Sequence, residues 1–342
     1  MLVEKNVPLQ HCNTFGIAAR AETLVRIRSQ DDIRQFLADP LWGRQPVFVL
    51  GGGSNVVLTG DVAPVVLKME IMGMRLLRET DKHWIVEIGA GERWHDMVAW
   101  TLAQGYTGLE NMALIPGTVG AAPVQNIGAY GLEVGELVAR VRAWDFRRND
   151  YVDYSREACR FAYRHSVFKE EGRHLDGSLA IVALTLRLPK RWQANCRYAD
   201  VAQKLTARGI TQPVASDVAA AVIAVRQRKL PDPAVLGNAG SFFKNPTVTP
   251  EQCQDIIARD PKIVQDWVAR QGVDAARFMQ VYNSFSVAQA PARATQLTRA
   301  YRVEGTPMLV VGGKYAVTPA APERMMQVVG ELVDKVRAEQ KK

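Results

Sequence analysis

Residues 47–58 read VFVLGGGSNVVL. The first four are apolar, a pattern typical of a strand buried on both faces of a sheet. Three glycines follow, and without Cβ atoms their backbone can take positive φ angles and approach a ligand closely. Ser54 and Asn55 then add a hydroxyl and an amide beside consecutive N–H groups, a nest suited to a phosphate or pyrophosphate. A hairpin turn is the alternative, since Gly-Gly is a common hairpin signal. Three glycines with Ser-Asn exceed what a hairpin needs, so we predict an anion-binding loop.

The sequence around this loop predicts a small α/β unit. Leu24–Ile27 and Pro64–Met69 have the apolar composition of strands. Ser29, with Asp32 three residues later, marks the start of a helix that ends before Pro40.

The chain beyond this unit predicts an antiparallel sheet with helices. The expected strands are Trp84–Ile88, Val138–Phe146 and Leu179–Leu188. Helical spacing is seen over Arg93–Gln104, which Gly105 caps, over Asp217–Arg228, and after the N-cap Thr249 with Pro250 at the first helical position. Further on, short helices are expected over Trp267–Phe278, Ser286–Tyr301 and Pro322–Val336, and a hairpin with strands Met308–Val311 and Lys314–Val317.

Residues 110–131, ENMALIPGTVGAAPVQNIGAYG, have no clear periodicity and are mostly small. Long structureless loops inside a compact domain are usually functional. We expect this one to wrap a second stretch of backbone around the same ligand. A surface loop is the alternative, but Ile115, Val119, Val124 and Ile127 are too apolar for one.

Composition narrows the class of protein. The length of 342 residues suggests two or three domains. The net charge of +8 fits either an anionic small substrate or a generally basic surface, and no Lys/Arg block is interleaved with aromatics as in a nucleic-acid surface. The four cysteines are far apart, without a CxxC, which predicts a reduced cytoplasmic protein and no metal site. We see no secretory signal and no apolar run of membrane-spanning length, and expect no membrane association.

Five motifs in order resemble the UDP-N-acetylenolpyruvoylglucosamine reductase family over residues 13 to about 258. They are NTFGI (Asn13–Ile17), GGGSN (Gly51–Asn55), IPGTVGAAPVQNIGAYG (Ile115–Gly131), FAYRHSVFK (Phe161–Lys169), and KLPDP through GNAGSFFKNP (Lys229–Pro246). The resemblance implies an α+β fold. A two-lobed FAD-binding domain of the vanillyl-alcohol-oxidase (PCMH) type is expected over residues 1–190, with lobes of about 1–69 and 70–190, followed by a truncated substrate domain over 191–258.

The resemblance also implies a reaction. NADPH reduces noncovalently bound FAD, and UDP-N-acetylglucosamine enolpyruvate is reduced to UDP-N-acetylmuramate for peptidoglycan synthesis. Arg164 corresponds to the arginine that holds the substrate carboxylate and its developing charge, and Ser241 to the proton donor. The alternatives are a surface ion pair for Arg164 and a turn serine for Ser241.

Further positions follow from the same motifs. Those for the cofactor are Gly51, Gly52, Gly53, Ser54, Asn55, Ile115, Pro116, Gly117, Gly120 and Gly128. Those for the substrate are Tyr130, Tyr163, Tyr198, Arg226, Lys229 and Asn245. Arg226 and Lys229 would meet the diphosphate of the UDP group, although cations at a helix C-terminus also suit the helix dipole.

The chain departs from this family after about residue 258, and residues 261–342 resemble the C-terminal part of DsbA-type disulfide oxidoreductases. The matching stretches are GVDAARF (Gly272–Phe278), YNSFSV (Tyr282–Val287), GTPMLVVGGKY (Gly305–Tyr315) and the last helix. A partial thioredoxin-like segment is implied, without the CxxC of such domains. The reductase family's C-terminal glutamate has no match either, because Glu304, Glu323 and Glu331 belong to this tail. The chain therefore resembles two truncated proteins joined.

Three functions compete. The first is an FAD-dependent reductase acting on a UDP-sugar in the cytoplasm, with no nucleic acid and no obligate protein partner. The second is a flavin-binding remnant without turnover, because the glutamate is missing. The third is a thiol-disulfide oxidoreductase, which the missing CxxC and signal peptide disfavour.

Overall fold

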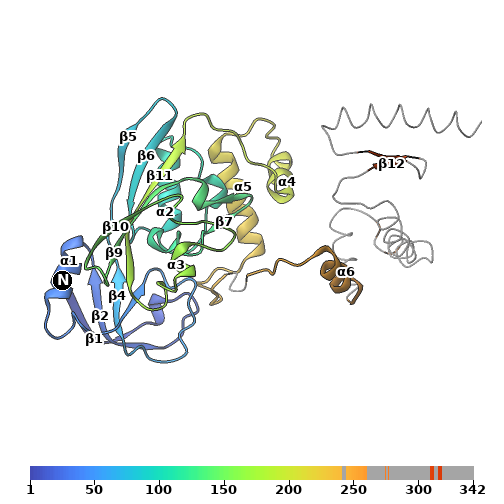
Figure 1. Ribbon diagram of the computed structural model, residues 1–342. Helices are drawn as coiled ribbons and strands as arrows, with labels where there is room; N and C mark the ends of the chain where they lie inside the picture. Colours follow the sequence, from blue (N-terminus) through green and yellow to red (C-terminus); the bar gives the residue numbers. More distant parts are fainter. Residues whose placement is uncertain (241–243, 260–273, 275, 277–308, 312–314, 318–342) are drawn as a thin grey trace, which may run out of the picture. The chain divides into compact units, whose positions relative to one another are not determined.

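The computed structural model describes residues 1–240, 244–259, 274, 276, 309–311 and 315–317. The chain divides into two compact units, Met1–Lys244 and Asn245–Lys342. The first unit contains two lobes, each built on its own sheet (Figure 1). The domain boundaries expected near residues 69, 190 and 258 stay predictions.

The first lobe is a four-stranded sheet in the order β1 (Leu2–Pro8), β2 (Arg20–Ile27), β4 (Val65–Met69) and β3 (Val47–Leu50). β1 and β2 are antiparallel, and the other pairs are parallel. Helix α1 (Gln30–Ala38) begins with the predicted capping box, in which Ser29 Oγ accepts from the Asp32 N–H at 3.2 Å and the Asp32 carboxylate accepts from the Ser29 N–H at 3.0 Å. The two strands and the helix predicted here are confirmed.

Strand β3 is where the sequence predicts, but it is an edge strand. Only Leu50 is fully buried, and the three residues before it are half-buried. Val47 and Val49 pack against one apolar core and Phe48 against another. Both faces of the strand are thus covered while its edge stays open. The expected cover on both faces is confirmed. The place of the strand at the edge of the sheet was not predicted, because a four-residue apolar run does not reveal the order of strands.

The second lobe is an antiparallel sheet in the order β10 (Asp150–Ser155), β9 (Val138–Asp145), β11 (Leu179–Pro189), β6 (His83–Gly89) and β5 (Met74–Glu79). The predicted strands β6, β9 and β11 are confirmed. β1, β5 and β10 were not predicted. They are edge strands with largely exposed, often charged residues, so the apolar alternation that marks a strand is weak in them.

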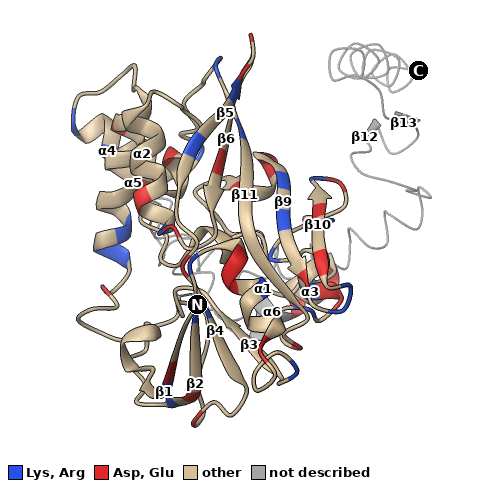
Figure 2. Ribbon diagram, turned by 90° about the vertical axis from the view of Figure 1, so that its left-hand side faces the viewer, with Lys and Arg blue, Asp and Glu red and all other residues tan. Residues whose placement is uncertain are grey.

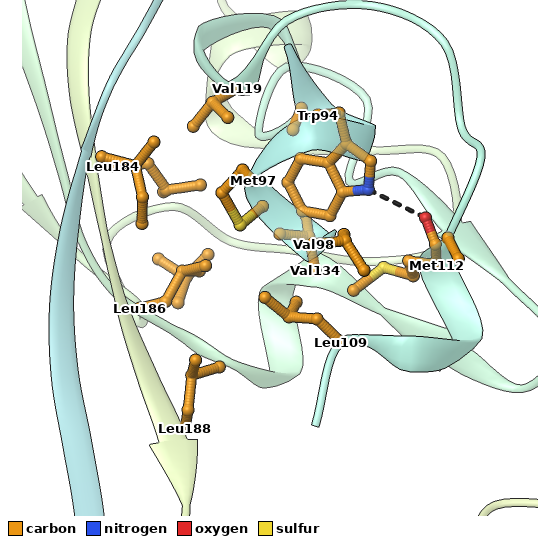
Figure 3. Close-up of a cluster of buried hydrophobic side chains, with 14 of the residues drawn as sticks. Trp94, Met97, Val98, Leu109, Met112, Val119, Val134, Leu184, Leu186 and Leu188 are labelled. Atoms are coloured by element: carbon orange, nitrogen blue, oxygen red, sulfur yellow. Dashed lines mark hydrogen bonds between the residues drawn. The ribbon is translucent and has the colours of Figure 1, made fainter. Parts of the chain in front are cut away.

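Helices α2 (Trp94–Ala103), α4 (Ala199–Ala207) and α5 (Ala215–Lys229) share one buried cluster with the second sheet (Figure 1). Figure 3 shows its centre, where Met97 lies opposite Leu184 and the Trp94 indole N–H donates to the Met112 carbonyl at 3.0 Å. The helices predicted over 93–104 and 217–228 are confirmed, whereas α4 was not predicted. The apolar residues of α4 and α5 therefore complete the core of the sheet.

Residues 110–131 are more ordered than expected. They contain two short 3₁₀ helices, η2 (Glu110–Met112) and η3 (Val119–Ala121), and strand β7 (Gly128–Ala129), which pairs with β8 (Leu132–Glu133). The prediction of a structureless loop is wrong, because elements of two or three residues have no readable period. Val119 is fully buried, and Ile115, Val124 and Ile127 pack against the core, so the argument against a surface loop is confirmed. The remaining short helices of this unit are η1 (Gln10–Cys12), η4 (Val134–Glu136) and α3 (Val167–Glu170).

In the second unit, helix α6 (Pro250–Arg259) begins after Thr249, whose hydroxyl accepts from the Gln252 N–H while the Gln252 amide oxygen accepts from the Thr249 N–H. β12 (Leu309–Val311) and β13 (Tyr315–Val317) form an antiparallel pair. The predicted helix start and hairpin strands are confirmed. The helices predicted over 267–278, 286–301 and 322–336 fall almost wholly outside the described residues. In the part of the chain that the structure covers, no helix is long and apolar enough to cross a bilayer.

Candidate functional site

Three of the motifs meet in the first unit. The Thr14 N–H donates to the Gly53 carbonyl at 3.1 Å, and the Thr14 hydroxyl donates to the Asn238 carbonyl at 2.6 Å. The Asn55 amide donates to the Ala239 carbonyl at 3.2 Å. The NTFGI turn, the GGGSN loop and the start of the GNAGS stretch are therefore tied together, although they are up to 224 residues apart in sequence.

The glycine-rich loop lies directly against the second predicted loop. A Cβ on Gly51 would sit 2.6 Å from Thr118 Oγ1, and one on Gly52 would sit 2.9 Å from the Gly117 Cα. Gly53 and Gly117 have φ angles of +63° and +104°, which favour glycine. The missing side chains thus let two backbone segments approach closely. That both segments surround one ligand stays a prediction.

The GGGSN loop has the electrostatics of an anion site. Among the described residues, no hydrogen bond has a backbone N–H of residues 52–55 as its donor. The Lys68 ammonium donates to the Gly51 carbonyl, and burial lowers the pKa of this lysine. Unpaired backbone N–H groups beside a half-buried cation attract an anion such as a pyrophosphate.

A cavity of about 100 Å³ lies beside this loop. It is smaller than a typical cofactor pocket of roughly 300–1,000 Å³, so a dinucleotide must also use the open surface or move the walls. Thr118 Oγ1 on its wall is buried and has no hydrogen-bond partner among the residues that the structure describes. An orphaned buried hydroxyl is costly unless a ligand satisfies it. The cavity is lined by Val49, Gly51, Met69, Ala90, Thr118, Gly120, Ala121, Val124, Phe168, Arg173, His174, Leu179 and Ile181.

Two of these features fit FAD: the backbone N–H groups of residues 52–55 suit the pyrophosphate, and the orphaned hydroxyl lies on the cavity wall. Of the other predicted cofactor residues, Gly120 lines the cavity, Ile115 packs against the core, and Pro116 is exposed. Gly128 lies in β7, where a Cβ would sit 2.7 Å from the Leu132 carbonyl oxygen. The cofactor roles of these residues stay predictions.

Four of the predicted substrate residues lie in one neighbourhood at the end of α5. The rings of Tyr130 and Tyr198 meet edge-to-face with centroids 5.2 Å apart. Burial raises the pKa of Tyr130, while the charges of Arg226 and Lys229 act to lower it. Burial also lowers the pKa of Arg226, whose Nε donates to the Leu114 carbonyl at 3.2 Å. Two aromatic rings with two cations provide the groups that a nucleoside diphosphate requires.

Arg164 occupies a tight turn with a φ angle of +49°, unusual for a residue with a side chain. The turn is closed by a bridge between Ala162 and His165, and the Asn126 amide donates to the Ala162 carbonyl at 3.0 Å. Asn126 and Tyr130 also have positive φ angles, of 48° and 49°. Backbone strain of this kind clusters at functional sites.

Three predicted site residues remain, Tyr163, Ser241 and Asn245. Tyr163 is exposed on the same turn as Arg164. Ser241 lies outside the described residues. Asn245 is exposed and belongs to the second unit.

Several residues of this region were not predicted. Thr118 lies inside a quoted motif, but only the structure reveals its orphaned hydroxyl. Lys68 was read as part of a strand, and nothing in its sequence context indicates the bond to Gly51. Asp200, which pairs with Lys229 at 2.6 Å, lies in the helix that the sequence did not predict.

Comparison with known proteins agrees with this geometry. The family model "FAD binding domain" matches residues 21–148, and the model "DSBA-like thioredoxin domain" matches residues 253–329. The chain is 51% identical over 258 residues to the UDP-N-acetylenolpyruvoylglucosamine reductase of Dechloromonas aromatica, covering 75% of each protein. It is 53% identical over 254 residues to that of Burkholderia mallei, covering 74% of this chain and 72% of that protein.

A solved structure supports the fold. The crystal structure of UDP-N-acetylenolpyruvylglucosamine reductase (MurB) from Thermus caldophilus matches with a TM-score of 0.51 at 23% identity, over 72% of this chain and 76% of that one. The expected α+β fold with a two-lobed FAD-binding domain of the vanillyl-alcohol-oxidase type is confirmed. The chain belongs to the UDP-N-acetylenolpyruvoylglucosamine reductase family and continues into a segment similar to DsbA-like thioredoxin domains.

Proposed function

We propose that this protein reduces UDP-N-acetylglucosamine enolpyruvate to UDP-N-acetylmuramate in peptidoglycan synthesis, with FAD as cofactor and NADPH as reductant. The observation that carries the proposal is the meeting of the glycine-rich loop with the loop at 117–118, in a chain about half identical to enzymes of this name. A cytoplasmic location is in keeping with the four cysteines, all of which are free.

FAD would bind noncovalently, with its pyrophosphate held by the backbone N–H groups of residues 52–55 and with the Thr118 hydroxyl as a further hydrogen-bonding group. When bound, FAD supplies hydride transfer from NADPH to the enolpyruvyl double bond. The protein's own part is to hold the cofactor and the substrate so that the transfer can occur.

Hydride addition leaves charge on the carbon next to the substrate carboxylate. Arg164 would hold the carboxylate and stabilise the resulting enolate. Of these two roles the second contributes more to the rate, because it acts on charge that develops during the reaction. Ser241 would deliver the proton to that carbon. A serine hydroxyl is a weak acid, so this transfer depends on the charge built up beside it.

The UDP group would bind at the end of α5. Arg226 and Lys229 are the expected partners of the diphosphate, and Tyr130 and Tyr198 offer ring faces and hydroxyls nearby. Tyr163 and Asn245 complete the set of substrate contacts that the family motifs suggest.

Turnover is expected to be far below that of relatives that carry the C-terminal glutamate. That group shares enolate stabilisation and proton delivery, and loss of one such group commonly costs roughly a hundredfold or more in rate. A second candidate function is therefore a flavin-binding protein with little turnover. The similarity to DsbA-like domains from residue 253 supports it. Without a CxxC the chain has no dithiol pair for disulfide exchange, which disfavours a thiol oxidoreductase.

A purified sample distinguishes these functions. A yellow flavin spectrum supports FAD binding, and NADPH consumption that depends on the UDP-enolpyruvyl sugar supports the reductase. A chimera with a family-type C-terminal segment joined after residue 258 is the positive control. An unmodified chain as fast as the chimera would contradict the expected loss of turnover.

A further inference from the structure

Two of the cations at the end of α5, Arg228 and Lys229, are already paired with a carboxylate. Figure 2 shows the basic last turn of this helix in blue, near α4. Asp200, in the first turn of α4, accepts from the Lys229 ammonium at 2.6 Å and from the Arg228 guanidinium at 3.1 Å. The Asp200 side chain is only 24% exposed. One carboxylate is thus shared by two cations that are themselves partly exposed.

Asp200 lies in the neighbourhood assigned to the UDP group. After burial, the charges that act on the Tyr130 pKa are those of Arg226 and Lys229, which lower it, and that of Asp200, which raises it. The carboxylate is therefore within electrostatic reach of the ring that packs on Tyr198. A diphosphate drawn to Lys229 would meet this negative charge at close range, and like charges at close range repel.

Arg226 differs from its neighbours. Its Nε donates to the Leu114 carbonyl, and burial is the main influence on its pKa, which it lowers. The Arg226 side chain is therefore oriented by its bond to the Leu114 carbonyl and not by Asp200. In the free protein Arg226 is available to an anion, whereas Lys229 must first leave its partner.

We propose that Asp200 is a positioning residue that competes with the substrate diphosphate for Lys229. The inference rests on the proposed binding of the UDP group at the end of α5. In the free protein Asp200 holds Lys229 beside α4, and the diphosphate takes the lysine over on binding. Part of the attraction of Lys229 for the diphosphate then offsets the loss of the ion pair. UDP binding is therefore weaker than Arg226 and an unpaired Lys229 would give.

The test is UDP affinity, measured by calorimetry on the FAD-loaded full-length protein. Asp200→Asn should bind UDP roughly three- to tenfold more tightly, because the competing charge is gone. Asp200→Glu keeps the carboxylate and should bind as the wild type does. Asp31→Asn is the charge control, since it removes one negative charge from an exposed ion pair on α1 in the other lobe. It should leave UDP affinity unchanged.

A purely structural role for Asp200 predicts lower thermal stability and weaker UDP binding in the Asn variant. If that variant does not fold, Asp200→Ser makes the same charge change with a residue well suited to the start of a helix. Unchanged or weaker binding in a folded neutral variant overturns the inference. Lys229→Met separates this failure from that of the proposed function. If Lys229→Met weakens UDP binding while the neutral Asp200 variants do not tighten UDP binding, only the role of Asp200 is wrong. If it has no effect, the diphosphate site itself is wrong.

Discussion

The orphaned hydroxyl of Thr118 gives a sharp test of where the flavin lies. Thr118→Val keeps the shape of the side chain and removes only the hydroxyl. Without cofactor, Oγ1 is buried and unpaired, so its removal should stabilise the protein by about 1 kcal/mol or more. With cofactor, the same change removes a hydrogen bond worth roughly 1 kcal/mol.

These two effects add in the binding equilibrium. Stabilising the free form and weakening the bound form should together reduce FAD affinity by about 2 kcal/mol, which is roughly thirtyfold in Kd. The assays are flavin fluorescence titration of the apoprotein and thermal unfolding with and without FAD. We expect a higher melting temperature without FAD and a smaller gain on adding it.

Thr101→Val is the matched control. Thr101 is fully buried in α2, but its hydroxyl donates to the Val98 carbonyl at 2.8 Å. Its replacement should leave FAD affinity unchanged. If Thr118→Val lowers the melting temperature of the apoprotein and leaves FAD affinity intact, the hydroxyl does not face the cofactor.

Three further predictions concern the loops, the chemistry and the core. Gly52→Val should remove most bound flavin, because its side chain would collide with the Gly117 backbone; full flavin retention counts against the loop assignment. Ser241→Ala should leave flavin reduction by NADPH intact and slow reoxidation by substrate, as followed by stopped-flow; equal loss in both steps would indicate a structural residue. Burial by itself raises the pKa of Asp145, but hydrogen bonds from Arg173 and two backbone N–H groups hold it below its ordinary value. The charged pair therefore adds to the free energy of unfolding above about pH 4, and this contribution is lost as pH falls through the lower pKa of the folded state. The destabilisation by Asp145→Asn in urea melts, about 3–5 kcal/mol at pH 7, should therefore shrink in acid, and a pH-independent difference would refute the charged pair.

Sequence reasoning succeeded where residues have strong local signals. The capping box at Ser29 and the apolar strands β4, β6 and β11 were all predicted, because period and cap chemistry are local. It failed for the edge strands β5 and β10 and for α4. Their residues are held by neighbours that no local pattern reveals.

The site shows the same division. Glycines 51–53 and 117 were predicted as cofactor residues from motif and composition, and the structure places the two segments against each other. The bond of Lys68 to the loop and the pairing of Asp200 with Lys229 depend on contacts 17 and 29 residues apart in sequence. Such long-range polar contacts do not affect the composition or the hydrophobic periodicity of the sequence, so they can be identified only in the folded structure.

The reductase account is tested most directly in a single turnover. The purified, FAD-loaded protein is reduced with dithionite under anaerobic conditions and mixed with the UDP-enolpyruvyl sugar while flavin absorbance is recorded. The account predicts that the oxidised flavin spectrum returns only with this substrate, more slowly than in a relative with the C-terminal glutamate, with one UDP-N-acetylmuramate formed per flavin. A flavin that stays reduced over hours, or reoxidises without that product, would contradict it.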